Sequence, residues 1–174
     1  MSERYLPKSK FLKRVLSGEI ELEDTETAER HVQKLLNMVH DADPSNRDWA
    51  AFLIAHLTSD TPAIREALLT LADGDDPDAR DEALVGLARR APGAALARVA
   101  PLLKEELGIV ILEAVTILGD QSLLPALREI EGWDGEGEKV REQLRRALIA
   151  CERGVGEDMS LEERKRCQVL SVAP

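Results

Sequence analysis

The chain has 174 residues, which is enough for one domain with a sizeable core and short for two. Its 44% hydrophobic and 32% charged residues are typical of a folded protein rather than a disordered one. The formal net charge of −10 argues against general nucleic-acid binding, because phosphate contacts need clustered Lys and Arg. No apolar stretch approaches the roughly 20 residues that span a bilayer. The N-terminus also lacks a secretory signal, so we expect no membrane association and a cytoplasmic location.

The hydrophobic residues are mainly Ala and Leu, and aromatic residues make up only 3% of the chain. Ala, Leu, Glu and Arg are strong helix formers, whereas the β-branched residues that favour strands are sparse. The composition therefore predicts an all-α fold.

Charge is distributed unevenly along the chain. Residues 1–18 carry five basic side chains and a single acidic one, so the remainder is more acidic than the whole. Such a body would attract basic partners and speed their encounter. The alternative is an acidic surface that serves solubility alone.

Apolar residues at helical spacing predict a helix over 25–40, and further helices begin at three turn signals. Thr61 before Pro62 is a good helix start, because Thr caps the first turn and Pro suits the first helical position. The further first helices run over 61–72, 92–107 and 121–131. Each is followed by a second helical segment, so the predicted unit is helix, short turn, helix, repeated about four times.

A sequence motif recurs in the second helices. "DPSNRDWAAFLIAHL" begins at Asp43 and "DPDARDEALVGLARR" begins at Asp76, 33 residues later. Two later segments, "LGIVILEAVTILGD" from Leu107 and "GEKVREQLRRALIA" from Gly137, align by apolar register alone. Such helix pairs cannot bury their apolar faces singly, so we expect them to stack.

The Asp-Pro-x-x-Arg start and the Ala-x-x-x-Leu frame that follows it resemble the HEAT family of repeats, particularly its short bacterial kind. The resemblance covers about residues 25–153 and implies a right-handed α-α superhelix, a solenoid whose second helices line the concave face. It also implies bonds between neighbouring repeats from Asp43, Arg47, Asp76 and Arg80. The later copies lack the Asp-Arg pair apart from Arg141, so any such ladder is incomplete there.

The two ends differ from the repeats. Residues 1–24 hold a possible short helix, "KSKFLKRVL", and an acidic linker, and residues 154–174 hold a loop and a helix from Ser160 with a capping box to Glu163. Solenoids need atypical pieces to cover their last apolar faces, so both ends are expected to act as caps.

The chain offers no catalytic or metal-binding signature. No His-Glu dipeptide of the kind used by HEAT-like di-iron hydroxylases occurs, and the two cysteines, Cys151 and Cys167, lie far from each other and from any histidine. We therefore expect no cofactor, no metal and no enzymatic activity. The rival interpretation is a HEAT-like enzyme or enzyme subunit, either DNA glycosylase-like or bilin-lyase-like.

The repeat alignment places a candidate binding surface beside the buried frame of the second helices. Spacings of three and seven residues put its members on one face of each helix. Aromatic anchors ringed by charges are typical of protein-binding hot spots. Trp49 could instead pack under the N-terminal segment, against Phe11 or Leu12. The predicted partner-binding set is Trp49, Phe52, His56, Glu82, Arg89 and Glu113.

Together these features predict a non-enzymatic module that binds a basic protein on an acidic concave face. A concrete version is an immunity-type inhibitor or regulator that neutralises a basic protein. The sequence leaves the identity of the partner and the oligomeric state open.

Overall fold

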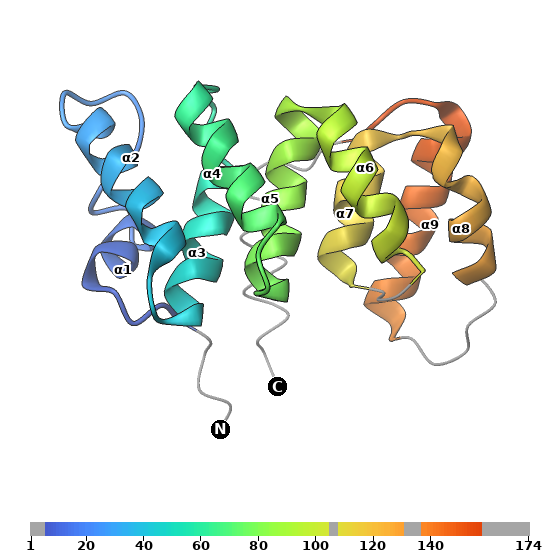
Figure 1. The fold of residues 1–174 in the computed structure, drawn as a ribbon, viewed down its shortest axis with the longest axis horizontal. Coiled ribbons are helices and arrows are strands. Elements are labelled where there is room, and N and C mark those ends of the chain that lie inside the picture. Colours follow the sequence, from blue (N-terminus) through green and yellow to red (C-terminus); the bar gives the residue numbers. More distant parts are fainter. Residues whose placement is uncertain (1–5, 105–107, 131–136, 158–174) are drawn as a thin grey trace.

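The computed structural model of the chain describes residues 6–104, 108–130 and 137–157. Every regular element in this part of the chain is a helix, which confirms the all-α prediction (Figure 1). No described helix is both long enough and apolar enough to cross a membrane. The predicted helix from Ser160 lies outside the described residues.

Within the described residues, four helix pairs follow a short N-terminal helix, α1 (Lys10–Leu16). In each pair the second helix runs opposite to the first, and the turns within the first two pairs lie at the lower edge in Figure 1. The pairs are α2 (Ala28–Asn37) with α3 (Pro44–Ala55), α4 (Pro62–Ala72) with α5 (Pro77–Arg90), α6 (Pro92–Leu102) with α7 (Ile109–Leu118), and α8 (Leu124–Ile130) with α9 (Glu138–Arg153). A short 3₁₀ turn at Met38–His40 follows α2, and another at Gln121–Leu123 precedes α8.

The second helices form one continuous row, in which α3 packs on α5, α5 on α7 and α7 on α9. We call these four helices the inner row. The helices α4, α6 and α8 lie beside it, toward the viewer in Figure 1, and each contacts the inner helix of its own pair. The pairwise stacking expected from the repeat is therefore present along the described chain.

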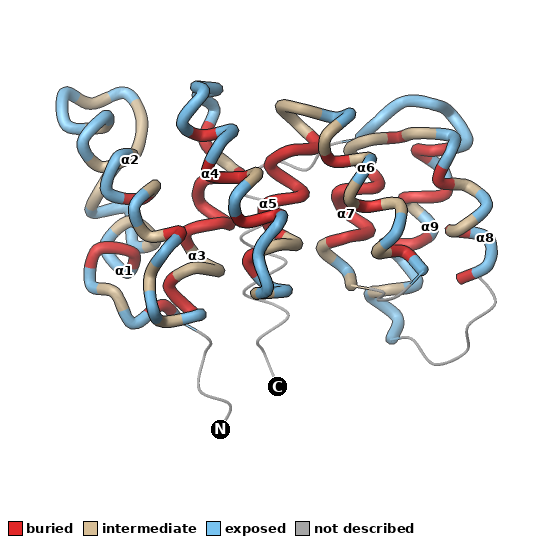
Figure 2. Tube along the Cα trace, in the orientation of Figure 1, coloured by how far each residue is buried: buried red, intermediate tan, exposed pale blue. Residues whose placement is uncertain are grey.

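The core follows the predicted apolar frame. Ala50, Ala83 and Ala114 of the inner row are fully buried, and Leu144 is 7% exposed. In Figure 2 the buried positions run along the inner row from α3 to α9. The three small alanine side chains let neighbouring helices approach closely, since interiors pack to crystal-like density.

Local sequence sets where the helices begin. Pro is the first residue of α3, α4, α5 and α6, where its missing N–H is no loss. Asp43 and Thr61 cap α3 and α4 by accepting hydrogen bonds from the backbone N–H groups of Ser45 and Ile64. The predicted Asp-Pro and Thr-Pro starts are thus confirmed.

Two predicted first helices are shorter or broken. The helix expected over 92–107 ends at Leu102, although the backbone N–H of Leu103 still donates to the Val99 carbonyl at 3.1 Å. The helix expected over 121–131 is split into a 3₁₀ turn and α8, and Pro125 is the second residue of α8. Proline explains the second departure, because Pro125 has no backbone N–H to donate to the Gln121 carbonyl.

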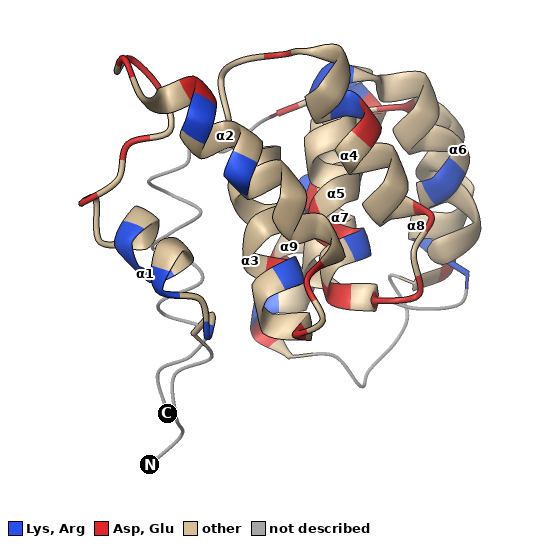
Figure 3. Cartoon of the chain, turned by 60° about the vertical axis from the view of Figure 1, so that its left-hand side comes forward, with Lys and Arg blue, Asp and Glu red and all other residues tan. Residues whose placement is uncertain are grey.

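The N-terminal segment packs against the first pair. Phe11 and Leu12 of α1 are buried, and the ammonium of Lys34 on α2 lies 4.6 Å from the ring centre of Phe11. The acidic linker after α1 returns to the α3–α4 loop, where the Glu23 carboxylate accepts from the Thr58 backbone N–H at 2.6 Å. Basic α1 and the acidic linker are visible as separate charge segments in Figure 3. The short N-terminal helix was predicted correctly.

Past α9 the chain turns back toward α7. Gly154 takes a left-handed conformation with φ 64° and ends α9, as glycine does at many helix C-termini. The backbone N–H of Glu157 then donates to the Thr116 carbonyl at 2.9 Å. The described chain therefore covers the C-terminal turn of α7.

Candidate protein-binding surface

Arg47 and Asp76 link the first two inner helices. Arg47 Nε donates to Asp76 Oδ2 at 3.0 Å, and its Nη1 donates to the Asp41 and Ala42 carbonyls at 2.9 and 3.2 Å. Asp76 stands at the N-cap of α5 but makes no side-chain capping bond. Its carboxylate is used for the bond to α3 instead, as the repeat resemblance implied.

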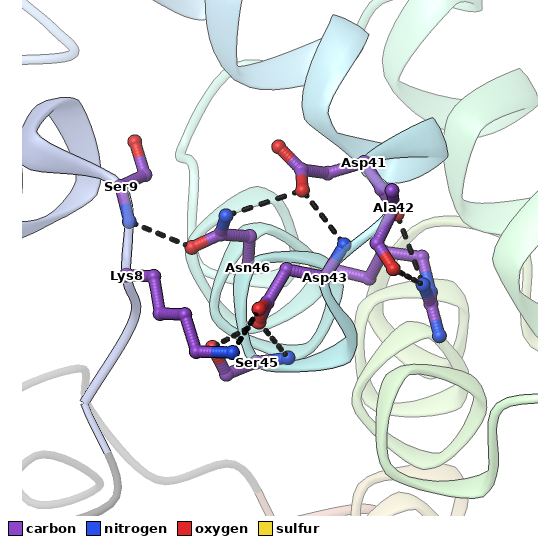
Figure 4. Close-up of polar contacts among 8 residues, drawn as sticks. Lys8, Ser9, Asp41, Ala42, Asp43, Ser45 and Asn46 are labelled. Atoms are coloured by element: carbon purple, nitrogen blue, oxygen red, sulfur yellow. Dashed lines mark hydrogen bonds and ion pairs between the residues drawn. The ribbon is translucent and has the colours of Figure 1, made fainter.

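Asp43 occupies the matching position at the start of α3, and its partner comes from the N-terminal segment (Figure 4). Lys8 donates to Asp43 Oδ2, and Ser45 Oγ donates to Asp43 Oδ1 at 2.6 Å. The hydrogen bond from Lys8 is the main reason that the pKa of Asp43 is lowered to about 2. The cation thus comes from the chain before α2 rather than from another inner helix.

Arg80 of α5 stands at the position that Arg47 holds in α3. Arg80 pairs with Asp81 of its own helix at 3.0 Å. The next inner helix, α7, begins after Gly108, which has no carboxylate to offer. That Arg80 bonds to a neighbouring repeat, as the resemblance implies, stays a prediction.

Three predicted partner-binding residues form an aromatic row on α3. The rings of Trp49 and Phe52 meet edge to face with centres 5.5 Å apart, and the rings of Phe52 and His56 lie 4.6 Å apart. Phe52 has no exposed surface, so its predicted role as a partner contact is wrong in this conformation. Trp49 is half-buried against the core. Both interpretations of Trp49, as an anchor or as part of the cap, stay predictions.

The three charged members of the predicted set are also largely buried. Glu82 and Glu113 are only 3% and 7% exposed. Arg89 lies 3.9 Å from Glu113 and donates to the Ala55 carbonyl of α3 at 3.1 Å. The prediction that these carboxylates present an open acidic face is therefore wrong, since their side chains lie inside the packed inner row.

Arg90 is a structural residue that the repeat alignment did not single out. It donates to the Ala55 carbonyl at 3.0 Å and also to the Leu57 carbonyl, at the end of α3. Cations are favourable at a helix C-terminus, where carbonyls are left unpaired. Burial lowers the pKa of the Arg90 guanidinium. The two adjacent arginines at the end of α5 were a sequence signal for a cation that caps a helix. The carbonyls that Arg90 caps, however, belong to the end of α3 and not to its own helix.

Exposed acidic side chains gather instead on the turns at the lower edge of Figure 1. Asp73 is bound by Arg98 through two hydrogen bonds of 2.8 Å, whereas Asp75 and Asp78 are exposed and make no ion pair with any described residue. Acidic residues mark these turns in Figure 3. We call this surface the acidic turn edge; its members are Asp41, Asp43, Asp73, Asp75, Asp76 and Asp78.

A groove of about 300 Å³ opens between the first two turns of this edge. Its lining comes from the 3₁₀ turn after α2, from α3, from the end of α4 and from the start of α5, so it exists only where two repeats meet. Apolar and polar side chains both line it, among them Val39, Leu71, Ala79, His40, Asp75 and Asp76.

The described residues contain no cluster of metal ligands, and the one cysteine among them is buried. No group of three or more His, Cys, Asp or Glu side chains within residues 6–104, 108–130 and 137–157 could hold a metal ion. Cys151 is buried, and this burial raises the pKa of its thiol to about 11, so little of it is the reactive thiolate at neutral pH.

By its described helices the chain is an all-α protein of stacked helix pairs, and no family model matches it. Protein YibA of Escherichia coli strain K12 is 33% identical to it over 94 residues, which are 53% of this chain and 34% of YibA. YibA of E. coli O157:H7 gives the same values. The X-ray structure of E. coli YibA superposes on 80% of this chain and 54% of that chain with a TM-score of 0.55, at 23% identity.

The chain spans about a third of the length of the curated relatives it matches. The structural likeness, at this level of identity, concerns the fold alone. The function therefore has to be inferred from the surfaces of this chain and not from these relatives.

Proposed function

We propose that this chain is a non-enzymatic protein-binding module that takes a basic protein partner on its acidic turn edge. In this proposal the stacked pairs form a HEAT-like right-handed superhelix, which holds successive turns in one line. The inner row is then the packed support of the edge, not the binding face itself.

The observation that carries the proposal is the unbalanced charge of two adjacent turns. Six carboxylates lie there, and ion pairs with Lys8, Arg47 and Arg98 involve only three of them. Asp75 and Asp78 project at the surface without a cation among the described residues. A row of like charges on rigid elements attracts a partner of opposite charge and orients it before contact.

An inhibitor or immunity-type role suits this chemistry. Neutralising a basic protein requires fast association, and complementary electrostatic fields raise association rates well above those of neutral surfaces. The buried inner row and its inter-helix bonds would keep the turns in place, so little ordering would oppose binding.

The test is capture of partners from the organism that encodes the chain, followed by titration of the purified partner at two salt concentrations. The variant carries Asp75→Lys and Asp78→Lys. Its matched control carries Glu29→Lys and Glu66→Lys, two exposed acidic residues on α2 and α4, which change the net charge equally. We expect the turn variant to lose at least about tenfold in affinity and the control to lose much less.

Two results would contradict the proposal. If both variants retain the same partners with the same affinity, the turn edge is not the binding surface. A salt-sensitive shift of DNA by the wild-type chain, abolished by Arg145→Glu and Arg146→Glu, would favour the DNA glycosylase-like alternative instead.

A further inference from the structure

We infer that the groove between the first two turns is a pocket for a single arginine side chain of the basic partner. This inference rests on the proposed function and deepens it, because it assigns one recognition element within the acidic turn edge. Two features support it: the residues that line the groove, and the bonds that hold the guanidinium of Arg47 at its side.

The size of the groove suits one side chain. Its volume of about 300 Å³ lies at the lower limit of small-molecule sites, which range over roughly 300–1,000 Å³. Val39, Leu71 and Ala79 line it and are themselves almost fully buried, so they present a firm apolar surface. The aliphatic stem of an arginine can cover such a surface while its charged head stays at the rim.

The charge of the groove selects a cation. Arg47 and Asp76 line it as a bonded pair, which leaves the Asp75 carboxylate as its unbalanced charge. The groove also meets the C-terminal turn of α4 at Thr70 and Leu71, where the partial negative charge of the helix dipole adds to that of Asp75. An anion would be repelled by both.

Arginine fits this site better than lysine. Arg47 shows that this junction accommodates a planar guanidinium, since its N–H groups reach Asp76 Oδ2 and the carbonyls of Asp41 and Ala42 together. Both hydrogen bonds from Arg47 to Asp76 end on Oδ2, and Oδ1 accepts no hydrogen bond from a described residue. A second guanidinium could share this carboxylate and engage Asp75, using its fork of donors as a single ammonium could not.

The experiment uses the full chain and Nα-acetyl-arginine methylamide as the probe. The isotope-labelled protein is titrated with the probe and followed by the NMR shifts of its backbone amides. We expect saturable shifts at His40, Gly74 and Asp75, with weak affinity. The citrulline analogue, which has the same shape without the charge, should bind at least about fivefold more weakly, and the lysine analogue should fall between the two.

Asp75→Asn provides the test variant and Asp78→Asn its matched control, because both aspartates are exposed on the same edge and only Asp75 lines the groove. We expect Asp75→Asn to weaken the arginine probe about threefold to fivefold and Asp78→Asn to weaken it less than about twofold. If the two variants weaken the arginine probe equally, the pocket is overturned and only a general attraction to the acidic turn edge remains. Equal affinities of the arginine probe and its citrulline analogue would overturn the pocket as well.

Absence of saturable shifts would also overturn the pocket. The proposed function would still stand if Asp75→Lys with Asp78→Lys abolished partner capture while the probe failed to bind. The two proposals therefore fail separately.

Discussion

Arg47 of α3 donates through Nε to Asp76 of α5 at 3.0 Å, and the same guanidinium bonds two carbonyls of the turn before α3. One side chain therefore joins two inner helices and the turn of the first pair. The Asp76 carboxylate, which would ordinarily cap its own helix, is used for this link instead. This bond therefore links the first two turns directly.

Replacing Arg47 with Ala should lower the free energy of unfolding by about 1–3 kcal/mol, because three acceptors lose a part-buried donor. Urea unfolding followed by circular dichroism measures the effect. The control is Arg65→Ala, which removes the more exposed pair with Asp60 and should cost less than about 1 kcal/mol. Equal losses would show that the Arg47 link contributes no more than a surface pair.

Phe52 is expected to act in the core rather than in partner binding. Phe52→Ala should lower the free energy of unfolding by about 3–5 kcal/mol, since a fully buried ring leaves a cavity. Ile149→Ala on α9, at a side chain that is 38% exposed, should change it by less than about 0.5 kcal/mol. A stable Phe52→Ala protein that had lost only partner affinity would restore the original prediction for this residue.

Two glycines should respond in opposite directions to alanine. A Cβ on Gly86 of α5 would lie 3.0 Å from Ala55 Cα and 2.8 Å from Leu68 Cδ2, so Gly86→Ala should destabilise by about 1–3 kcal/mol despite the better helix propensity. A Cβ on Gly93 of α6 meets nothing within 4 Å, and Gly93→Ala should stabilise by about 0.4–1 kcal/mol. Thermal unfolding of the two variants compares them directly. A stabilised Gly86→Ala would mean that α3 and α5 pack less closely.

The pair between Lys8 and Asp43 predicts a dependence of stability on acid. The pKa of Asp43 is lowered from 3.8 to about 2 in the folded chain, so its contribution is complete above pH 3.8 and is lost as the pH falls toward 2. Lys8→Met should raise this pKa toward its ordinary value, which an NMR titration of the Asp43 carboxyl would show. Lys10→Met removes an equal charge from the same segment and serves as the control. An unchanged pKa in Lys8→Met would assign the shift to Ser45 alone.

The sequence by itself determined the local structure. The helices that begin at Pro44, Pro62 and Pro77 were predictable because capping and the fixed φ of proline act between residues a few positions apart. The frame of Ala50, Ala83 and Ala114 was predictable as well, because the period of a helix repeats in the spacing of its apolar residues.

Only the tertiary structure decided which polar side chains are buried and which residues they bond within the fold. Glu82 flanks the apolar frame, and whether a flanking residue is buried depends on how neighbouring helices are tilted and spaced, which no local pattern encodes. Arg90 finds its acceptors at Ala55, the last residue of α3, and at Leu57 just beyond it, 35 and 33 positions away in the sequence. The groove beside Asp75 likewise forms only where the turns of two pairs are brought together. Periodicity predicts a helix face, whereas the exposure of that face is set by long-range packing.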